Sequence, residues 1–312
     1  MSKMIATREA YGEALRQLGE ENIKVVALDA DLAKSTKSYD FGKVFPERFF
    51  DMGVAEQNMI GTAAGLAAAG KIPFCSTFAV FAAGRAFEQI RNSVAYSALN
   101  VKIGASHAGI TVGEDGGSHQ SVEDLALMRA LPNMTVFVPA DQAETAGAVR
   151  AAADIDGPVY IRLGRMPVPS LHPAEFRFEP GRGVLLREGK DATIIACGIM
   201  VKAALTAAEQ LAGQGIETTV LDIHTLKPLD TESIIKVARL TGVVVTAEEH
   251  SIIGGLGSAV AETLSENLPT PLKRVGVADQ FGTSGKPAEL LQHFGLTPEA
   301  ITTAVKKLIS QR

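Results

Sequence analysis

The sequence has no tryptophan, few aromatic residues and almost no cysteine. Aromatic side chains make up 5% of its 312 residues, and its two cysteines are Cys75 and Cys197. Both lie inside apolar runs typical of strands, so we interpret them as reduced core thiols of a cytoplasmic protein. No apolar run reaches membrane-spanning length, and the first residues lack the apolar core of a secretory signal. These absences predict a soluble protein with no membrane segment.

Blocks of consecutive lysine or arginine are also missing. Together with a formal net charge of −5, this argues against nucleic acid and anionic membrane surfaces as main ligands. Small metabolites and protein partners remain. Since 46% of the residues are hydrophobic and 21% are charged, the 312-residue chain is long enough for two globular domains.

Short apolar runs alternate with segments of helical period along the chain. In the first half we expect helices from Thr7, near Glu56, over 82–98, near 122–130 and over 141–153. The strands expected between them cover 24–29, 48–51, 72–76, 101–105, 134–138 and 159–163. This alternation predicts an α/β fold with a mostly parallel sheet that helices cover on both faces.

A proline-rich segment separates two such patterns. Residues 166–183 contain four prolines and have no helical period, so we expect a first domain over 1–166, a linker over 167–190 and a smaller domain over 191–312. In the second domain the expected strands cover 192–197, 217–221, 243–247 and 272–277. The last helix is expected to begin after Thr297. Both domains are expected to be doubly wound.

One carboxylate stands at the start of a helix that is otherwise small and apolar. This is Glu56, within the segment 49–70. Small residues recur on one face of the expected helix, where another backbone could approach closely: Gly61, Ala64, Gly65 and Ala68. In one interpretation, Glu56 is an acidic residue favoured by the helix dipole. In the other, it lies in an apolar cleft formed with a partner, where desolvation raises its pKa and lets it share a proton with a bound heterocycle.

The loops that follow the expected strands carry the residues suited to chemistry, because ligands bind at the carboxyl ends of parallel strands. The loop 106–120 holds four glycines, the histidines His107 and His119, and two carboxylates, one of them Asp115. These side chains could transfer protons, or the segment could be a solvated surface loop. The histidine spacing matches no short metal-binding pattern, so we expect no metal ligands on this chain.

Other candidates come from the remaining loops. Phe78 and Phe81, three residues apart at the start of a helix, could stack on an aromatic ring or belong to the core. Arg8, Ser35 and Arg165 could bind a phosphate, or each could be an ordinary surface residue. In the second domain, the segments 248–250 and 254–257 resemble a phosphate loop only loosely.

Several of these motifs together resemble one enzyme family. They are ATR (6–8), DADLAKS (29–35), GVAEQNM (53–59), STFAVF (76–81), SHAGITVGEDGGSHQ (106–120) and RLGR (162–165). Along essentially its whole length the chain resembles the C-terminal half of transketolase, which is a pyrimidine-binding domain followed by a C-terminal domain. The resemblance implies a transferase of carbohydrate metabolism, such as the pentose phosphate pathway, that uses thiamine diphosphate to move a two-carbon unit from a ketose to an aldose.

The resemblance also implies roles for individual residues. Glu56 matches the glutamate that bonds the pyrimidine nitrogen of the cofactor and promotes deprotonation of its reactive carbon. Around the cofactor, Phe78 and Phe81 match the aromatic residues at the pyrimidine, and Asp31 matches an aspartate along the substrate channel beside it. At the sugar, Asp115 matches the acceptor for a hydroxyl, and His119 matches a histidine beside the reacting carbons. The substrate-phosphate contacts are matched by His107, Arg8, Ser35 and Arg165. Glu56, His119 and His107 are the expected catalytic residues.

The chain departs from the family pattern at four positions and lacks one segment. Ala55 and Gln57 stand where a basic residue and a histidine are frequent, Gly84 replaces a third aromatic residue, and Gly117 replaces a common proline. No Gly-Asp-Gly segment, which holds Mg²⁺ and the diphosphate in the family, occurs in the sequence. The resemblance therefore implies a split transketolase in which an N-terminal subunit ligates Mg²⁺ and two copies of each chain form an α2β2 assembly that acts on sugar phosphates.

Three alternatives remain open at this point. The β subunit of a 2-oxo-acid dehydrogenase shares the two-domain plan and the glutamate, but its substrates carry no phosphate for Arg8 and Arg165 to bind. A split enzyme similar to 1-deoxyxylulose-5-phosphate synthase accepts the AEQ sequence around Glu56, although the stretch ending at His119 favours transketolase. A non-catalytic subunit that kept the fold is the third alternative, since a fold alone does not establish activity.

Overall fold

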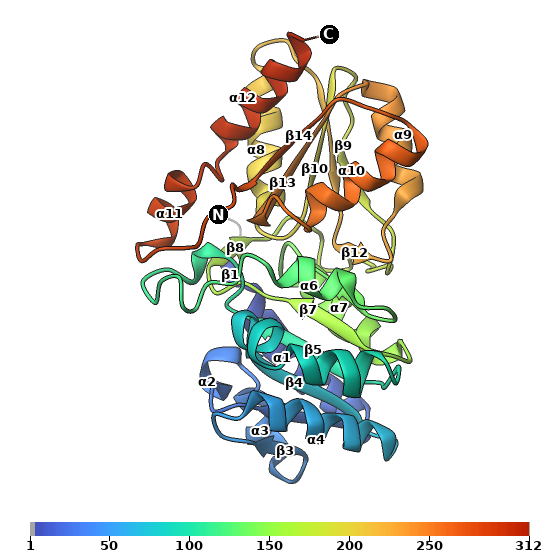
Figure 1. Cartoon of the computed structure of the whole chain (residues 1–312), viewed down its shortest axis with the longest axis vertical. Helices are drawn as coiled ribbons and strands as arrows, with labels where there is room; N and C mark the ends of the chain where they lie inside the picture. The colour runs from blue at the N-terminus through green and yellow to red at the C-terminus, as the bar shows by residue number, and fades with distance from the viewer. Residues whose placement is uncertain (1–3, 312) are drawn as a thin grey trace.

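The computed structural model describes residues 4–311 and divides them between two α/β domains that lie end to end along the long axis (Figure 1). The first is built on a seven-stranded sheet. In spatial order its strands are β12 (Thr225–Lys227), β6 (Thr135–Phe137), β7 (Val159–Arg162), β5 (Lys102–Ser106), β4 (Ile72–Phe78), β2 (Val25–Asp29) and β3 (Phe49–Asp51). All neighbouring pairs are parallel except β12 with β6.

Helices cover both faces of this sheet, and strand β2 shows why. Its apolar side chains alternate between two cores: Val25 and Ala27 face one, and Val26 and Leu28 face the other. The helical elements of this domain are α1 (Thr7–Glu21), α2 (Ala33–Thr36), α3 (Tyr39–Val44), η1 (Pro46–Arg48), α4 (Glu56–Ala68), η2 (Phe81–Arg85), α5 (Phe87–Gln89), η3 (Ile90–Ala95), η4 (Ile110–Val112), α6 (Asp124–Ala130) and α7 (Gln142–Asp154). Helices α1, α3 and α7 pack on the first core, and α4, η3 and α6 pack on the second.

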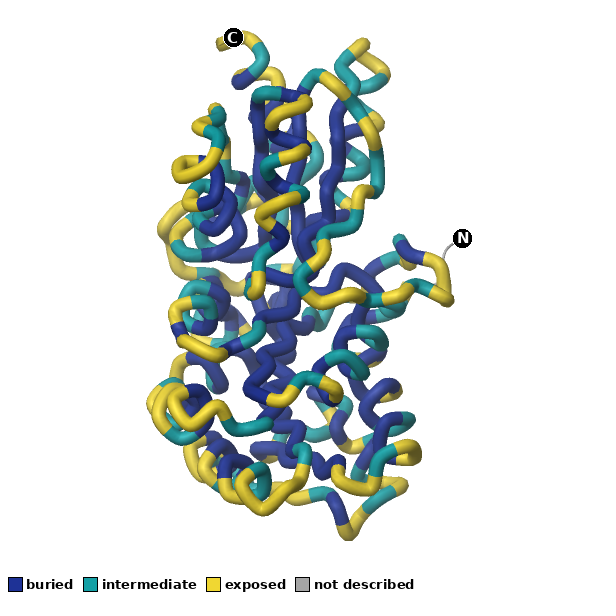
Figure 2. The backbone as a smooth tube through the Cα atoms, turned by 90° about the vertical axis from the view of Figure 1, so that its right-hand side faces the viewer, coloured by how far each residue is buried: buried dark blue, intermediate teal, exposed yellow. Residues whose placement is uncertain are grey.

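The second domain has a five-stranded sheet with the same plan. Its strands in spatial order are β14 (Leu272–Val277), β13 (Val244–Ser251), β10 (Ala192–Ala196), β11 (Thr218–Asp222) and β9 (Val184–Arg187), the last antiparallel. Its helices are α8 (Met200–Ala212), α9 (Thr231–Thr241), α10 (Leu256–Asn267), α11 (Pro287–His293) and α12 (Pro298–Ile309). The central strands of both sheets are buried (Figure 2). The prediction of two mostly parallel α/β domains is confirmed.

The junction between the domains differs from the expected simple linker. Residues 167–190 contain β8 (Pro167–Pro169), which pairs with β1 (Met4–Ala6), and β9, which belongs to the second sheet. Strand β12 then returns from the second domain to extend the first sheet. One apolar cluster includes Leu28 of the first domain and Leu221 of the second, so the domains share part of their core.

The expected helix over 82–98 is wrong in detail. Strand β4 ends at Phe78, so this residue lies on a strand and not at a helix start. The following segment forms two π-helical turns, η2 and η3, separated by the short helix α5. Such turns carry an extra residue per turn and are frequent at functional sites. No helix among residues 4–311 is long and apolar enough to cross a membrane.

Candidate active site

The candidate residues meet at the carboxyl ends of β2, β4, β5 and β7. Contacts connect most of them in an unbroken series that runs from the start of α4 to the start of α2. The series is Glu56, Arg85, Phe81, Phe78, His107, Arg8 and Ser35, with His119 beside both phenylalanines. Residues far apart in the sequence therefore form one site, as expected for this edge of a parallel sheet.

Glu56 begins helix α4 and is 1% exposed. Both of its carboxylate oxygens accept hydrogen bonds from Nη1 of Arg85, at 2.8 and 2.9 Å. The Arg85 guanidinium also lies over the Phe81 ring, 4.4 Å from its centroid. A buried carboxylate needs a partner of this kind. Glu56 is therefore a buried carboxylate held by Arg85, and its contact with a bound heterocycle stays a prediction.

Arg85 was not among the residues singled out from the sequence. Its spacing could have pointed to it: Arg85 follows Phe81 by four residues, and two helical side chains at this spacing lie on one face. The family's frequent basic neighbour of the glutamate is replaced here by Ala55, and Arg85 supplies a positive charge to Glu56 from a different element.

Two phenylalanines and two histidines form an aromatic group beside Glu56. The rings of Phe78 and Phe81 are stacked, with centroids 5.8 Å apart and an interplanar angle of 9°. The His107 ring stacks on Phe78 with centroids 3.8 Å apart, and the His119 ring meets Phe81 edge to face with centroids 5.5 Å apart. Phe78 is buried and Phe81 is half-buried, so this aromatic group joins the core to the site surface.

The contacts of His107 determine which ring nitrogen carries the proton. Nε2 lies 3.2 Å from Nη1 of Arg8, and Nδ1 lies 2.9 Å from Oγ of Ser106. Because a guanidinium only donates, Nε2 must accept, and the proton sits on Nδ1. Burial, followed by the charges of Arg8 and Arg165, lowers the pKa of His107 from 6.5 to about 3. The imidazole is therefore neutral at physiological pH.

This depressed pKa predicts a pH effect on stability. Between about pH 6.5 and pH 3 the unfolded chain binds a proton at His107 that the folded chain does not, so stability is lost as the pH falls through this range. The substitution His107→Gln keeps an acceptor for Arg8 but cannot be protonated. Between pH 7 and pH 5 its free energy of unfolding should fall by about 2 kcal/mol less than that of the wild type.

Urea unfolding at the two pH values measures this difference. The exposed His293→Gln is the control and should follow the wild type. Equal losses in the wild type and His107→Gln would mean that His107 is protonated in the folded chain.

Two arginines give the other end of the site its positive charge. Arg8 donates from Nη1 to the backbone oxygen of Ser35 at 2.9 Å, while its buried Nε has no hydrogen-bond partner among residues 4–311. Arg165 donates to the backbone oxygen of Val112 and lies 3.3 Å from the carboxylate of Asp115. Burial and then the charge of Arg165 lower the pKa of Arg8. An unpaired guanidinium donor near a second cation suits an anionic ligand.

The loop 106–120 is fixed by the second domain. Oε1 of Glu249 accepts a hydrogen bond from the backbone N–H of Thr111 at 2.7 Å. Nε2 of Gln120 donates to the backbone oxygens of Ile110 and Thr283, both at 3.0 Å. A Cβ on Gly109, whose φ is +79°, would lie 2.3 Å from the Glu249 carboxyl carbon. The interpretation of this segment as a solvated surface loop is therefore wrong for its buried half, while Asp115 lies on its exposed tip.

The weak phosphate-loop pattern in the second domain is explained by a helix cap. The two carboxylate oxygens of Glu248 accept the backbone N–H groups of Leu256 and Gly257, both at 2.7 Å. These are the donors that a phosphate would need at the start of α10. Since both N–H groups are already bonded to Glu248, the start of α10 has no free donors for a phosphate at these two positions.

Two family models match this chain. The transketolase pyrimidine-binding domain matches residues 3–170, and the transketolase C-terminal domain matches residues 181–301. The chain belongs to the transketolase family. A Methanocaldococcus jannaschii protein described as a transketolase C-terminal section is 52% identical over 301 residues, which cover 96% of this chain and 94% of that protein.

Two further relatives extend the comparison. The 6-deoxy-6-sulfo-D-fructose transketolase subunit SqwH of Clostridium sp. (strain MSTE9) is 49% identical over 305 residues, covering 98% of this chain and 95% of that protein. A solved structure described as "Split gene transketolase, inactive beta4 tetramer" is 61% identical, covers 99% of both chains and has a TM-score of 0.91. The similarity therefore covers the transketolase pyrimidine-binding and C-terminal domains together.

The exposed face of α4 lies beside the candidate site. A Cβ on Gly61 or Gly65 would meet no atom of another element within 4 Å, and Val54, which precedes the helix, is 73% exposed. The expected face of small residues is wrong at one position, because Ala64 is buried in the core beneath it. On the remaining face Gln57 is exposed at the start of the helix, and Gly61, Gly65 and Ala68 carry no side chain longer than a methyl group.

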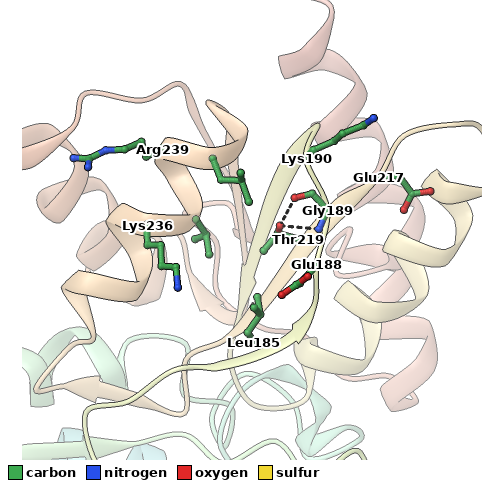
Figure 3. A pocket seen from close by; sticks show the side chains of 10 residues that line it. Leu185, Glu188, Gly189, Lys190, Glu217, Thr219, Lys236 and Arg239 are labelled. Atoms are coloured by element: carbon green, nitrogen blue, oxygen red, sulfur yellow. Dashed lines mark hydrogen bonds between the residues drawn. The ribbon is translucent and has the colours of Figure 1, made fainter.

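Of two hollows in the surface, one is lined by predicted site residues and the other is not. One of about 360 Å³ is lined by Asp31 and Ser35, so Asp31 lies near the Ser35 end of the site but outside the series of contacts. A larger hollow of about 870 Å³ lies in the second domain beside α9, between Lys236 and Gly189, and contains none of the predicted transketolase residues (Figure 3). There Oγ1 of Thr219 exchanges hydrogen bonds with the backbone of Gly189.

Proposed function

We propose that this chain is the C-terminal subunit of a split transketolase. It transfers a two-carbon ketol unit from a ketose phosphate to an aldose acceptor with thiamine diphosphate. The observation that carries the proposal is the unbroken series of contacts from Glu56 to Arg8. One end offers a buried carboxylate and an aromatic pair, and the other offers an unpaired guanidinium donor in a region of positive charge.

The first end fits the pyrimidine of the cofactor. A flat, partly polar ring can pack against Phe81 while one ring nitrogen bonds to the carboxylate of Glu56. When bound, thiamine diphosphate supplies a carbon nucleophile and stabilises negative charge on the transferred unit. Glu56 holds a proton at the ring nitrogen. Arg85, whose side chain is 47% exposed, must share or release the carboxylate when the ring binds.

The second end fits the substrate. Arg8 and Arg165 bind the phosphate, and neutral His107 orients Arg8 through Nε2. His119 stands between the aromatic pair and solvent, where it can donate to or accept from the sugar oxygens at the reacting carbons. Asp115, on the exposed loop tip, accepts a hydrogen bond from a sugar hydroxyl. Asp31 lines the entrance beside Ser35.

The other half of the site belongs to a partner. No Gly-Asp-Gly segment for the metal and diphosphate occurs in the 312 residues, so an N-terminal subunit holds Mg²⁺ and the diphosphate in our proposal. The open face of α4, with Gly61 and Gly65, allows close packing of another subunit next to Glu56. Two copies of each chain then form an α2β2 enzyme.

Reconstitution tests this proposal. The chain is mixed with its N-terminal partner subunit, thiamine diphosphate and Mg²⁺, and is offered xylulose 5-phosphate with ribose 5-phosphate. We expect ketol transfer by the mixture and none by either subunit alone, since each carries half of the site. A 6-sulfo ketose, the substrate class in the name of SqwH, is the comparison donor.

Other outcomes identify the alternatives. Consumption of pyruvate without an aldose would indicate a 2-oxo-acid dehydrogenase subunit, and pyruvate with glyceraldehyde 3-phosphate would indicate a 1-deoxyxylulose-5-phosphate synthase. An assembled complex that is inactive with every donor would favour a non-catalytic subunit. Turnover by the isolated chain would contradict the division of the site.

A further inference from the structure

Three buried ionisable side chains meet where the two domains and the segment between them touch. Glu144 comes from helix α7 of the first domain, and Asp222 ends strand β11 of the second. His172 lies in the segment that follows β8. One potential ligand atom from each residue lies within 4.8 Å of the other two. None of the three belongs to the candidate active site.

The distances around His172 match those between metal ligands. Its Nε2 lies 3.6 Å from Oε1 of Glu144 and 3.8 Å from Oδ2 of Asp222. In a tetrahedral site with bonds of about 2.1 Å, neighbouring ligand atoms are about 3.4 Å apart. These separations are longer than hydrogen bonds, and they leave room for an ion between the three atoms.

The same atoms have no other partners. Oε1 of Glu144, both carboxylate oxygens of Asp222 and Nε2 of His172 are buried and have no hydrogen-bond partner outside this cluster among residues 4–311. The side chains of Glu144 and Asp222 are fully buried, and that of His172 is 3% exposed. Buried polar atoms in folded proteins nearly always have a partner, so one ligand atom from each of three residues, with only the other two nearby, indicates a missing ligand.

A fourth residue holds the histidine as the outer shell of a metal site does. Oδ2 of Asp141 lies 3.4 Å from Nδ1 of His172, on the side of the ring away from Nε2. Asp141 is itself fixed, because its carboxylate accepts the backbone N–H groups of Leu171, His172 and Glu144. A carboxylate behind a metal-bound histidine fixes the ring orientation and strengthens the ligand.

We propose that Glu144, His172 and Asp222 bind one divalent transition-metal ion that links the two domains. Two carboxylates and one imidazole suit Zn²⁺ or a similar ion, whereas Mg²⁺ prefers oxygen ligands alone. The two negative charges of the carboxylates balance the charge of the ion. The cluster could not be found from ligand spacing in the sequence, because its members come from three separate parts of the chain.

Metal-dependent melting of the full chain tests this site. The chain is stripped with a chelator and its thermal midpoint is measured with and without Zn²⁺. At a free concentration of one hundred times Kd, we expect the ion to raise the wild-type midpoint by about 5 °C. Metal analysis after desalting should find one ion per chain, and Co²⁺ in the same site should show the visible absorption of tetrahedral coordination.

Two conservative variants separate this site from other zinc-binding groups. Glu144→Gln and Asp222→Asn each remove one ligand charge without changing shape, and the amide oxygen at position 144 can still accept the N–H of Ala140. Without metal the two variants should melt no lower than the wild type, because each removes the repulsion between two buried carboxylates that face each other. With Zn²⁺ both should lose the shift and the bound ion, whereas the exposed His293→Gln should keep both.

Two results would overturn the proposal. One is a wild-type chain that binds no ion and shows no shift, in which case the cluster holds only shared protons. The other is an equal shift in the wild type and both variants, which would place the ion elsewhere on the chain. Neither result bears on the transketolase activity, because the experiment uses the chain without its cofactor or partner.

Discussion

Glu56→Gln is expected to lower kcat of the reconstituted enzyme at least about 100-fold, the scale of a lost proton-transfer group. An amide has nearly the same shape and can still accept a hydrogen bond from Arg85, so the fold and the assembly should persist. It cannot hold a proton at the cofactor ring nitrogen in the way that a carboxyl group does. Steady-state ketol transfer with xylulose 5-phosphate measures kcat, and gel filtration with the partner subunit measures assembly.

The control for this variant is Glu299→Gln, an exposed acid on α12 in the other domain, which should keep wild-type kcat. A loss of activity together with loss of the complex would mean that Glu56 acts on assembly. Wild-type turnover by an intact Glu56→Gln complex would contradict the proton-holding role, and with it the assignment of this end of the site to the pyrimidine.

Most of the fold could be predicted from hydrophobic patterns, because parallel strands buried on both faces form continuous apolar runs. Lys102 is a charged exception within a strand that was nevertheless predicted. It begins a fully buried strand, yet its ammonium group donates to the backbone oxygens of Ile155 and Gly157, both at 2.7 Å. The pairing of β12 with β6 of the first sheet could not be predicted, because β12 has only three residues and no distinctive pattern.

The candidate site was predictable as a set of residues but not as an arrangement. Family motifs pointed to Glu56, His107 and Arg8 one by one. Nothing in the sequence says that Arg85 pairs with Glu56 or that His107 accepts from Arg8, because both contacts depend on the path of the backbone through η2 and on the positive φ of His107. The cluster around His172 depends in the same way on the meeting of two domains.

The second large effect concerns a buried ion pair that supports the site from behind. Asp124, at the start of α6, accepts from Nε of Arg162 at 2.9 Å and from the Tyr160 hydroxyl at 2.9 Å. Arg162 also donates to the backbone oxygen of Glu249, whose side chain fixes the loop 106–120. The pair therefore joins α6 and β7 to the strand of the second domain that anchors the active-site loop.

Asp124→Ala is expected to lower the free energy of unfolding by about 3–5 kcal/mol, because it leaves the buried Arg162 guanidinium without its ion-pair partner. Urea unfolding followed by circular dichroism measures the change. The exposed pair of Arg16 and Glu20 provides the control, and Glu20→Ala should leave the midpoint unchanged since surface pairs contribute little. A loss below about 1 kcal/mol in Asp124→Ala would show that water or a rearranged side chain reaches Arg162. In that case the loop 106–120 would have to be held by Glu249 and Gln120 without help from this ion pair.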